Sequence, residues 1–308
     1  MTSTSPTLAG RTIDRERLQK IAETYKKKSQ LKSIWHRFRK NKMAVFGLIV
    51  FLIMVLVALC APLFLDYETD IIQQSILMKN DPPSLEHPFG MDLYGRDIFK
   101  RVLWGARISM SVGIVVVLIS ITIGTIFGSL AGFYGGILDD ILMRIMDIML
   151  NIPATLMAIA IVASFGNSIR NVIIALSIEQ IPKMARIVRS QIITIKNGEF
   201  IEAAYACGTS DKRIIFRHIL PNALSPIIVE ATLTVARSII SIAGLSFIGM
   251  GIQPPDPEWG SMLSESKRYL RECPHLVIAP GLAIVLSVMS LTMIGDGLRD
   301  ALDPKMKK

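Results

Sequence analysis

Three uncharged apolar runs constrain this chain more than any other feature. Residues 43–65 contain no charged side chain in 23 positions, and residues 108–138 and 276–295 are equally free of charge. At about 1.5 Å per residue, a helix of that length crosses a hydrocarbon core of about 30 Å. Because hydrophobic residues make up 51% of the 308 positions and the mean hydropathy is +0.47, we expect an integral membrane protein.

Three further spans are predicted from less regular runs. They are residues 148–169 with Pro153, residues 171–188 interrupted by Glu179, Pro182, Lys183 and Arg186, and residues 223–252 with Glu230 and Arg237. We therefore expect an all-α polytopic membrane protein with six transmembrane helices. An even number of spans places both termini on one side of the membrane.

One face of the second predicted span consists of glycines at every fourth position, namely Gly124, Gly128, Gly132 and Gly136. Such a face lets a neighbouring helix approach closely. We interpret it as a helix-packing surface, and a gating contact is the alternative.

The polar segments divide the chain further. Residues 1–42 carry twelve Lys or Arg against three acids, and their apolar residues recur at helical spacing for most of their length. This pattern predicts a cytoplasmic basic amphipathic segment on an anionic lipid surface, with a disordered tail as the alternative before Gln30. The other divisions are the first transmembrane helix at 43–65, an extracytoplasmic loop at 66–106, a five-helix core at 107–297 with a cytoplasmic loop at 196–221, and a cytoplasmic tail at 298–308.

The distribution of positive charge predicts which side faces the cytoplasm. The amino terminus, the 134–147 turn, the 186–217 segment and the carboxyl tail hold 23 Lys and Arg, whereas the opposite loops hold 8. Excess positive charge marks the cytoplasmic side, so we expect both termini there. The net charge of +9 is explained in the same way and requires no nucleic-acid partner.

Residues 199–222 are the most distinctive polar interruption between the apolar runs. Helical spacing leads from Glu202, Ala203 and Ala204 to Gly208, where glycine permits a backbone bend. A Leu220-Pro221 pair is expected to close the segment before the next span. The pattern predicts a helix, a glycine bend and a second helix, projecting into the cytosol.

Several enzyme classes are excluded by missing motifs. The sequence has no GxxxxGK[ST] phosphate loop, no HExxH and no GxSxG, and its three cysteines have no metal-ligand or paired spacing. Its four histidines are scattered. We expect neither catalysis nor a bound cofactor in this chain.

The motifs together resemble one family. EAAYACG at 202–208, nine intervening residues and then HILP at 218–221 resemble the cytoplasmic loop shared by ABC importer permeases. HPFGMDLYGRDIF from 87, GARIS from 105, AGFYGGILDDILMRIMDI from 131, GLSFIGMGIQPPDPEWG from 244 and GDGLRDALDP from 295 extend the resemblance over most of 87–304. His218 at its place is similar to the dipeptide, oligopeptide and nickel branch, specifically the C-type peptide permease. Ile242 departs from relatives that carry an acid there, so any function of that acid is in doubt here.

The resemblance implies a type I ABC importer permease fold in a bacterial or archaeal cytoplasmic membrane. It implies a homologous second permease, two ATP-binding subunits that carry ATP and Mg, an extracytoplasmic substrate-binding protein and a peptide substrate. The residues it assigns to coupling with the ATPase are Glu202, Ala203, Ala204, Gly208, Lys212, Arg213, His218, Leu220 and Pro221. Membrane anchoring by the bases at 212, 213 and 217 is the alternative.

Ionisable residues within the predicted spans are candidates for the translocation path. Charge at the bilayer centre costs about 2.5–3.5 kcal/mol on insertion scales, so Glu179, Glu230 and Arg237 should face a bundle interior, water or each other. A structural ion pair of the acids with Arg237 or with a partner subunit is the alternative. For the substrate, nickel chelates and glutathione-like compounds stand beside peptides, and an autonomous channel or secondary transporter is the alternative class.

Overall fold

The computed structural model describes residues 30–302, which are helical apart from turns, loops and one isolated bridge between Met91 and Asp97. The predictions made for residues 1–29 and 303–308 lie outside this range. The α-helices are α2 (Gln30–Lys40), α3 (Lys42–Phe64), α4 (Ile98–Tyr134), α5 (Gly136–Asn151), α6 (Ala154–Phe165), α7 (Ile169–Lys196), α8 (Glu199–Ala206), α9 (Asp211–Ile214), α10 (Leu220–Phe247), α11 (Trp259–Ser266) and α12 (His275–Leu302). Short 3₁₀ or π turns cover Tyr67–Ile72, Ile76–Met78, Ile215–Ile219 and Lys267–Tyr269.

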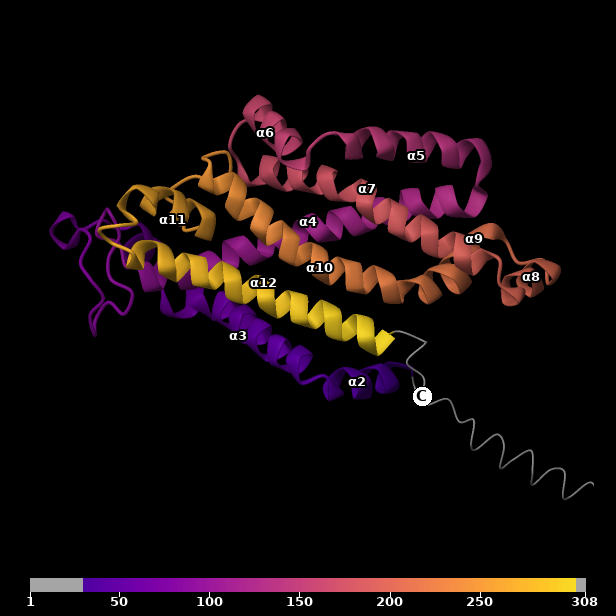
Figure 1. Ribbon diagram of the computed structural model, residues 1–308, viewed down its shortest axis with the longest axis horizontal. Coiled ribbons are helices and arrows are strands. Elements are labelled where there is room, and N and C mark those ends of the chain that lie inside the picture. Colours follow the sequence, from indigo (N-terminus) through magenta and orange to yellow (C-terminus); the bar gives the residue numbers. More distant parts are fainter. Residues whose placement is uncertain (1–29, 303–308) are drawn as a thin grey trace, which may run out of the picture.

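The long helices α3, α4, α7, α10 and α12 run along one another as a bundle (Figure 1). The outer loop and α11 gather at one end of the bundle, and α8 and α9 project from the other (Figure 1). Both α2 and the end of α12 lie toward the α8 end. The described chain therefore begins and ends at the same end of the bundle as the 199–222 segment (Figure 1).

Membrane-spanning character is clear for fewer helices than expected. Within residues 30–302, four helical segments are long and apolar enough to cross a bilayer: α3, α4, α12 and the continuous helix Asp211–Phe247. The α5–α6 pair adds a fifth if it is counted as one bent span. The six-span prediction is therefore not confirmed, because the charged residues of α7 keep it below the apolarity of the others.

The predicted span over 148–169 is not one continuous helix. The chain breaks at Ile152 and Pro153, and α5 and α6 meet at 86°. Proline removes a helical donor and disfavours helical backbone in the residue before it. At 12 residues, α6 is about 18 Å long and too short to cross a bilayer by itself.

Helix packing explains most of the glycine stripe. A Cβ added at Gly124 would lie 2.8 Å from Met184 Cβ, and one at Gly128 only 2.5 Å from the carbonyl oxygen of Ala185. Gly132 approaches Arg189 in the same way, so α7 is seated directly on the α4 backbone. Gly136 does not belong to this surface. It adopts φ +57° in the turn after α4 and has no neighbour within 4 Å of an added Cβ.

Replacing Gly128 with alanine is expected to lower the thermal stability of the purified protein. The new methyl group would collide with backbone, and overpacking of this kind costs about 1–3 kcal/mol. Gly281→Ala in α12 is the matched control, since nothing lies within 4 Å of its added Cβ. Equal melting temperatures for the two variants would contradict tight α4–α7 packing.

Helix α2 has the amphipathic character predicted for this part of the amino-terminal segment. Phe38 is buried against Ala44, Ile294 and Ala301, whereas Trp35 is 56% exposed. The Asn41 side chain accepts a hydrogen bond from Ala44 N at 3.1 Å and caps α3. One face of α2 is thus fixed to α3 and α12, and the exposed face with Trp35 remains available to a lipid surface.

Candidate functional site

The segment between α7 and α10 contains the predicted helix and glycine bend. After α8, Gly208 has φ +73°, a conformation that glycine adopts without strain. Gly208 N donates to Tyr205 O at 2.9 Å, and Thr209 N donates to Ala204 O at 3.1 Å. These two bonds form a Schellman motif, which satisfies the carbonyl groups left free at the helix end.

Apolar side chains hold this segment on the bundle. Ile201 of α8 is 1% exposed and packs in one cluster with Ile214, Ile215 and Ile219. The same cluster contains Phe133 from the end of α4, together with Val188 and Ile192 of α7. Lys196 adds a polar tie, because its ammonium group donates to the carbonyl oxygen of Phe133. Ile201 thus links α8 to an apolar cluster that includes residues of α4 and α7.

The outward face of the segment combines small, charged and aromatic residues. Glu202, Ala203, Lys212 and Arg213 are exposed, and Ala204 is half-buried at the edge of the apolar cluster. Sequence reasoning missed three exposed aromatic side chains here: Phe200, Tyr205 and Phe216 at 71%. These aromatic residues interrupt an otherwise polar stretch, and this pattern could have indicated an exposed contact surface.

The expectation that Leu220 and Pro221 close the segment is wrong. The chain runs from α9 through a π-helical turn into α10, so Asp211–Phe247 is one continuous helix. Pro221 directly follows the π-helical turn, in which Leu220 N donates to Ile215 O instead of to the carbonyl of Phe216, so the α-helical hydrogen-bond pattern is already interrupted where proline lacks a donor. Of the nearby candidates, His218 is half-buried, and its carbonyl oxygen accepts a hydrogen bond from Asn222 Nδ2 at 2.6 Å.

The ionisable candidates within the bundle do not come together. Glu179 on α7 is buried and receives Lys183 Nζ at 3.0 Å and Gln180 Nε2 at 2.9 Å. Glu230 on α10 instead forms an ion pair with Arg237, two turns further along the same helix. The two acids thus have separate cationic partners. The intrahelical pair expected as an alternative role for Arg237 is present.

A buried ionic cluster joins the two outer loops. Arg96, with 3% of its side chain exposed, bonds Asp92 at 2.6 Å and Glu265 at 3.0 Å. Arg101 lies 3.7 Å from each of these acids and donates to Ile71 O. We call these four side chains, Asp92, Arg96, Arg101 and Glu265, the outer clasp. Sequence reasoning missed it because Arg96 and Glu265 lie 169 positions apart.

Further contacts close the outer end. Tyr67 donates to Asp256 at 2.7 Å, and burial together with this bond raises the pKa of Tyr67 to about 12. The hydrogen bond from Lys100 lowers the pKa of Asp70 below its ordinary value. Trp259 is almost fully buried and donates from its indole nitrogen to Val102 O. The loops at 66–106 and 253–275 therefore form one fixed structure.

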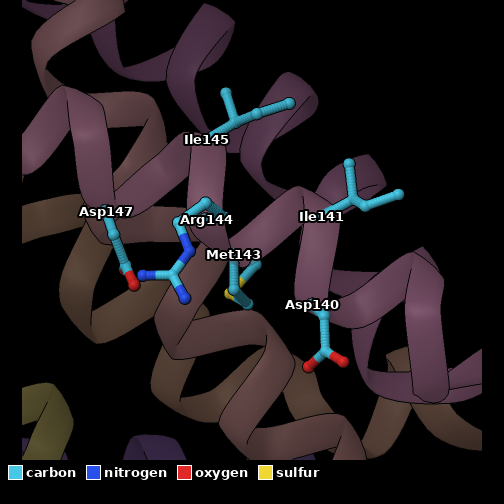
Figure 2. Close-up of a pocket in the computed structure, with 6 residues that line it drawn as sticks. All are labelled: Asp140, Ile141, Met143, Arg144, Ile145 and Asp147. Carbon is cyan, nitrogen blue, oxygen red and sulfur yellow. The ribbon is translucent and has the colours of Figure 1, made fainter.

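Helix α5 presents two chemically different faces (Figure 2). Asp140, Arg144 and Asp147 point to one side, and Ile141 and Ile145 to the other (Figure 2). Ion pairs fix α5 on α7, where Arg186 contacts Asp147 and Arg189 contacts Asp139. Across residues 30–302, the structure places no group of three or more His, Cys, Asp or Glu where it could hold a metal ion.

The sequence of this chain matches a family of membrane transport proteins. Residues 124–308 match the family described as binding-protein-dependent transport system inner membrane component, and residues 29–83 match the N-terminal TM domain of oligopeptide transport permease C. The chain is 46% identical over 285 residues to the dipeptide transport system permease protein DppC of Alkalihalophilus pseudofirmus, covering 92% of this chain and 93% of the relative. It is 45% identical to the glutathione transport system permease protein GsiD of Escherichia coli, covering 91% and 94%.

A solved structure shares the fold at low sequence identity. An inward-facing conformation of the MetNI methionine ABC transporter matches with a TM-score of 0.57 at 20% identity, covering 67% of this chain and 98% of that one. The family match covers more than half of the chain, and the curated relatives match over nearly all of it. The chain belongs to the family of binding-protein-dependent transport system inner membrane components, as a permease of the oligopeptide permease C type.

Proposed function

We propose that this chain is one of two permease subunits in an ABC importer, with ATP hydrolysed by separate subunits. The main support for this proposal is helix α8, which ends in a Schellman motif and packs through Ile201 in one apolar cluster with residues at the ends of α4 and α7. Its small residues Ala203 and Ala204 suit close docking in a cleft of an ATPase subunit. Lys212 and Arg213 supply positive charge for acidic groups on that partner.

The topology we propose has six crossings, with both termini and α8 in the cytoplasm. Helix α7 supplies the crossing that hydropathy does not identify. The support is its packing on the glycine face of α4 and the internal pairing of its charge, since Glu179 is bonded to Lys183. In this arrangement the outer clasp faces the substrate-binding protein.

The substrate class we propose is short peptides, including glutathione-like ones. The support is the identity of about 45% to permeases named for dipeptide and for glutathione transport. Nickel chelates are the alternative that the sequence motifs leave open. Glu179 and Glu230 are proposed to border the path; normal uptake kinetics in both Glu179→Gln and Glu230→Gln would count against this role.

The test is purification of the tagged chain from cells that express the whole transporter. We expect co-purification of a second permease and two ATPase subunits, and ATP hydrolysis stimulated by the peptide-loaded binding protein. Solute flux through the isolated chain without ATP would instead identify a channel. Ligand binding by the external protein, with dipeptide, glutathione and a nickel chelate compared, would settle the substrate class.

A further inference from the structure

A polar groove opens between α7, α10 and α12, on the part of the bundle nearest α8. Its volume is about 550 Å³, and its polar lining consists of Gln191, Asn222, Ser225, Glu230 and Arg299. The remaining wall is apolar and includes Val229 and Leu233. Small-molecule sites combine an apolar wall with a few polar groups in about this volume.

The two charged residues of the groove lie at the same level on facing helices. Because α11 connects the end of α10 to the start of α12, these helices run antiparallel. Gly295 of α12 lies against Leu233 of α10, since an added Cβ would be 2.6 Å from Leu233 Cδ2. One turn from this contact, toward α8, the chain places Arg299 on α12 and Glu230 on α10.

Both charged groups retain bonding capacity. The bonds from Arg237 and Thr234 to Glu230 go to Oε1, and within residues 30–302 no donor occupies Oε2. In the same range the guanidinium of Arg299 makes no ion pair or hydrogen bond, and its side chain is exposed. The groove thus presents a hydrogen-bond acceptor, the carboxylate of Glu230, and a cationic donor, the guanidinium of Arg299, beside its apolar wall.

From this geometry we infer that the groove binds a short zwitterionic peptide. Glu230 Oε2 accepts from the free ammonium group, Arg299 donates to the terminal carboxylate, and the peptide side chains lie on the apolar wall. Both residues line one groove of about 550 Å³, and two extended residues span about 7 Å, a length that suits a ligand held between side chains of neighbouring helices. This inference rests on the proposed function and assigns a binding station for the substrate on the side of the bundle nearest α8.

The test measures peptide binding to the intact transporter in phosphatidylcholine nanodiscs, without the external binding protein. The probes are dialanine, its C-terminal amide and its N-acetyl derivative, titrated by saturation-transfer NMR. The wild type is expected to bind each capped probe about tenfold more weakly than dialanine, as loss of one charged hydrogen bond implies. Arg299→Gln should bind dialanine and the amide equally, and Glu230→Gln should bind dialanine and the acetyl derivative equally.

Arg237→Gln is the matched control, because Arg237 contacts Glu230 but does not line the groove. It should keep both preferences, and Arg299→Lys should recover the preference for a free carboxylate. The site would be overturned if Arg299→Gln and Glu230→Gln kept the wild-type preference for dialanine over the capped probes, or if Arg237→Gln lost that preference to the same extent. It would also be overturned if phosphatidylethanolamine displaced the probes and the transporter did not discriminate among the peptides. If a Glu230 variant fails to assemble, the Arg299 pair of variants decides alone. Peptide import without dialanine binding defeats this inference only, whereas absence of any peptide import defeats the proposed function.

Discussion

Gly208→Val is expected to leave the protein inserted in the membrane while transport falls at least about tenfold. Gly208 has φ +73°, where a non-glycine residue pays about 1–2 kcal/mol and a β-branched residue more. No atom lies within 4 Å of an added Cβ, so the effect comes from backbone strain and not from a collision. Since 1.4 kcal/mol corresponds to a factor of ten, loss of the turn shifts most molecules out of the docking geometry.

The measurements are membrane content by immunoblot, peptide uptake, and ATPase stimulation by the loaded binding protein. Gly208→Asn is the matched control, because asparagine also adds a side chain but tolerates the left-handed conformation and caps helices in this way. It should retain most of the transport. Full uptake by the Gly208→Val protein would show that the Schellman turn is dispensable for coupling.

The α8 segment was largely predictable because its signals are local. A glycine just after a helix commonly adopts the left-handed conformation, and Gly208 does so. The continuation through Pro221 was not predictable from proline alone, because proline ends some helices and is accommodated in others where the hydrogen-bond pattern is already interrupted. In the structure a π-helical turn precedes Pro221, and Ile214, Ile215 and Ile219 pack in one cluster with residues of α7.

The membrane helices were likewise predictable only where the signal is local. Uncharged runs identify α3, α4 and α12 directly, since no other structure tolerates such a stretch in lipid. Pro153 lies early in the predicted span and the helix breaks there, and the ion pairs of α5 with α7 accompany the break. In α7, Arg186 and Arg189 pair with Asp147 and Asp139 of α5, and Lys183 pairs with Glu179 of the same helix. The crossing proposed for α7 therefore rests on contacts that hydropathy does not contain.

Arg96→Met is expected to destabilise the outer end of the protein more than any exposed substitution. Arg96 is buried between Asp92 and Glu265, and its removal leaves two carboxylates facing one remaining base, Arg101. Breaking a buried ion pair by removing one partner costs about 3–5 kcal/mol, because the other charge stays desolvated. We expect the thermal midpoint of the purified complex to fall by roughly 5–10 °C.

A second substitution separates charge imbalance from lost packing. In Arg96→Met/Glu265→Gln, one acid and Arg101 remain, so charge is balanced and at least half of the lost stability should return. Lys79→Met, an exposed change in the same loop, should leave the midpoint unchanged. A wild-type midpoint in Arg96→Met would contradict a clasp that stabilises the outer loops. Because these loops are the proposed docking surface, the single variant should also lose stimulation by the binding protein, and the double variant should regain it in proportion to its recovered stability.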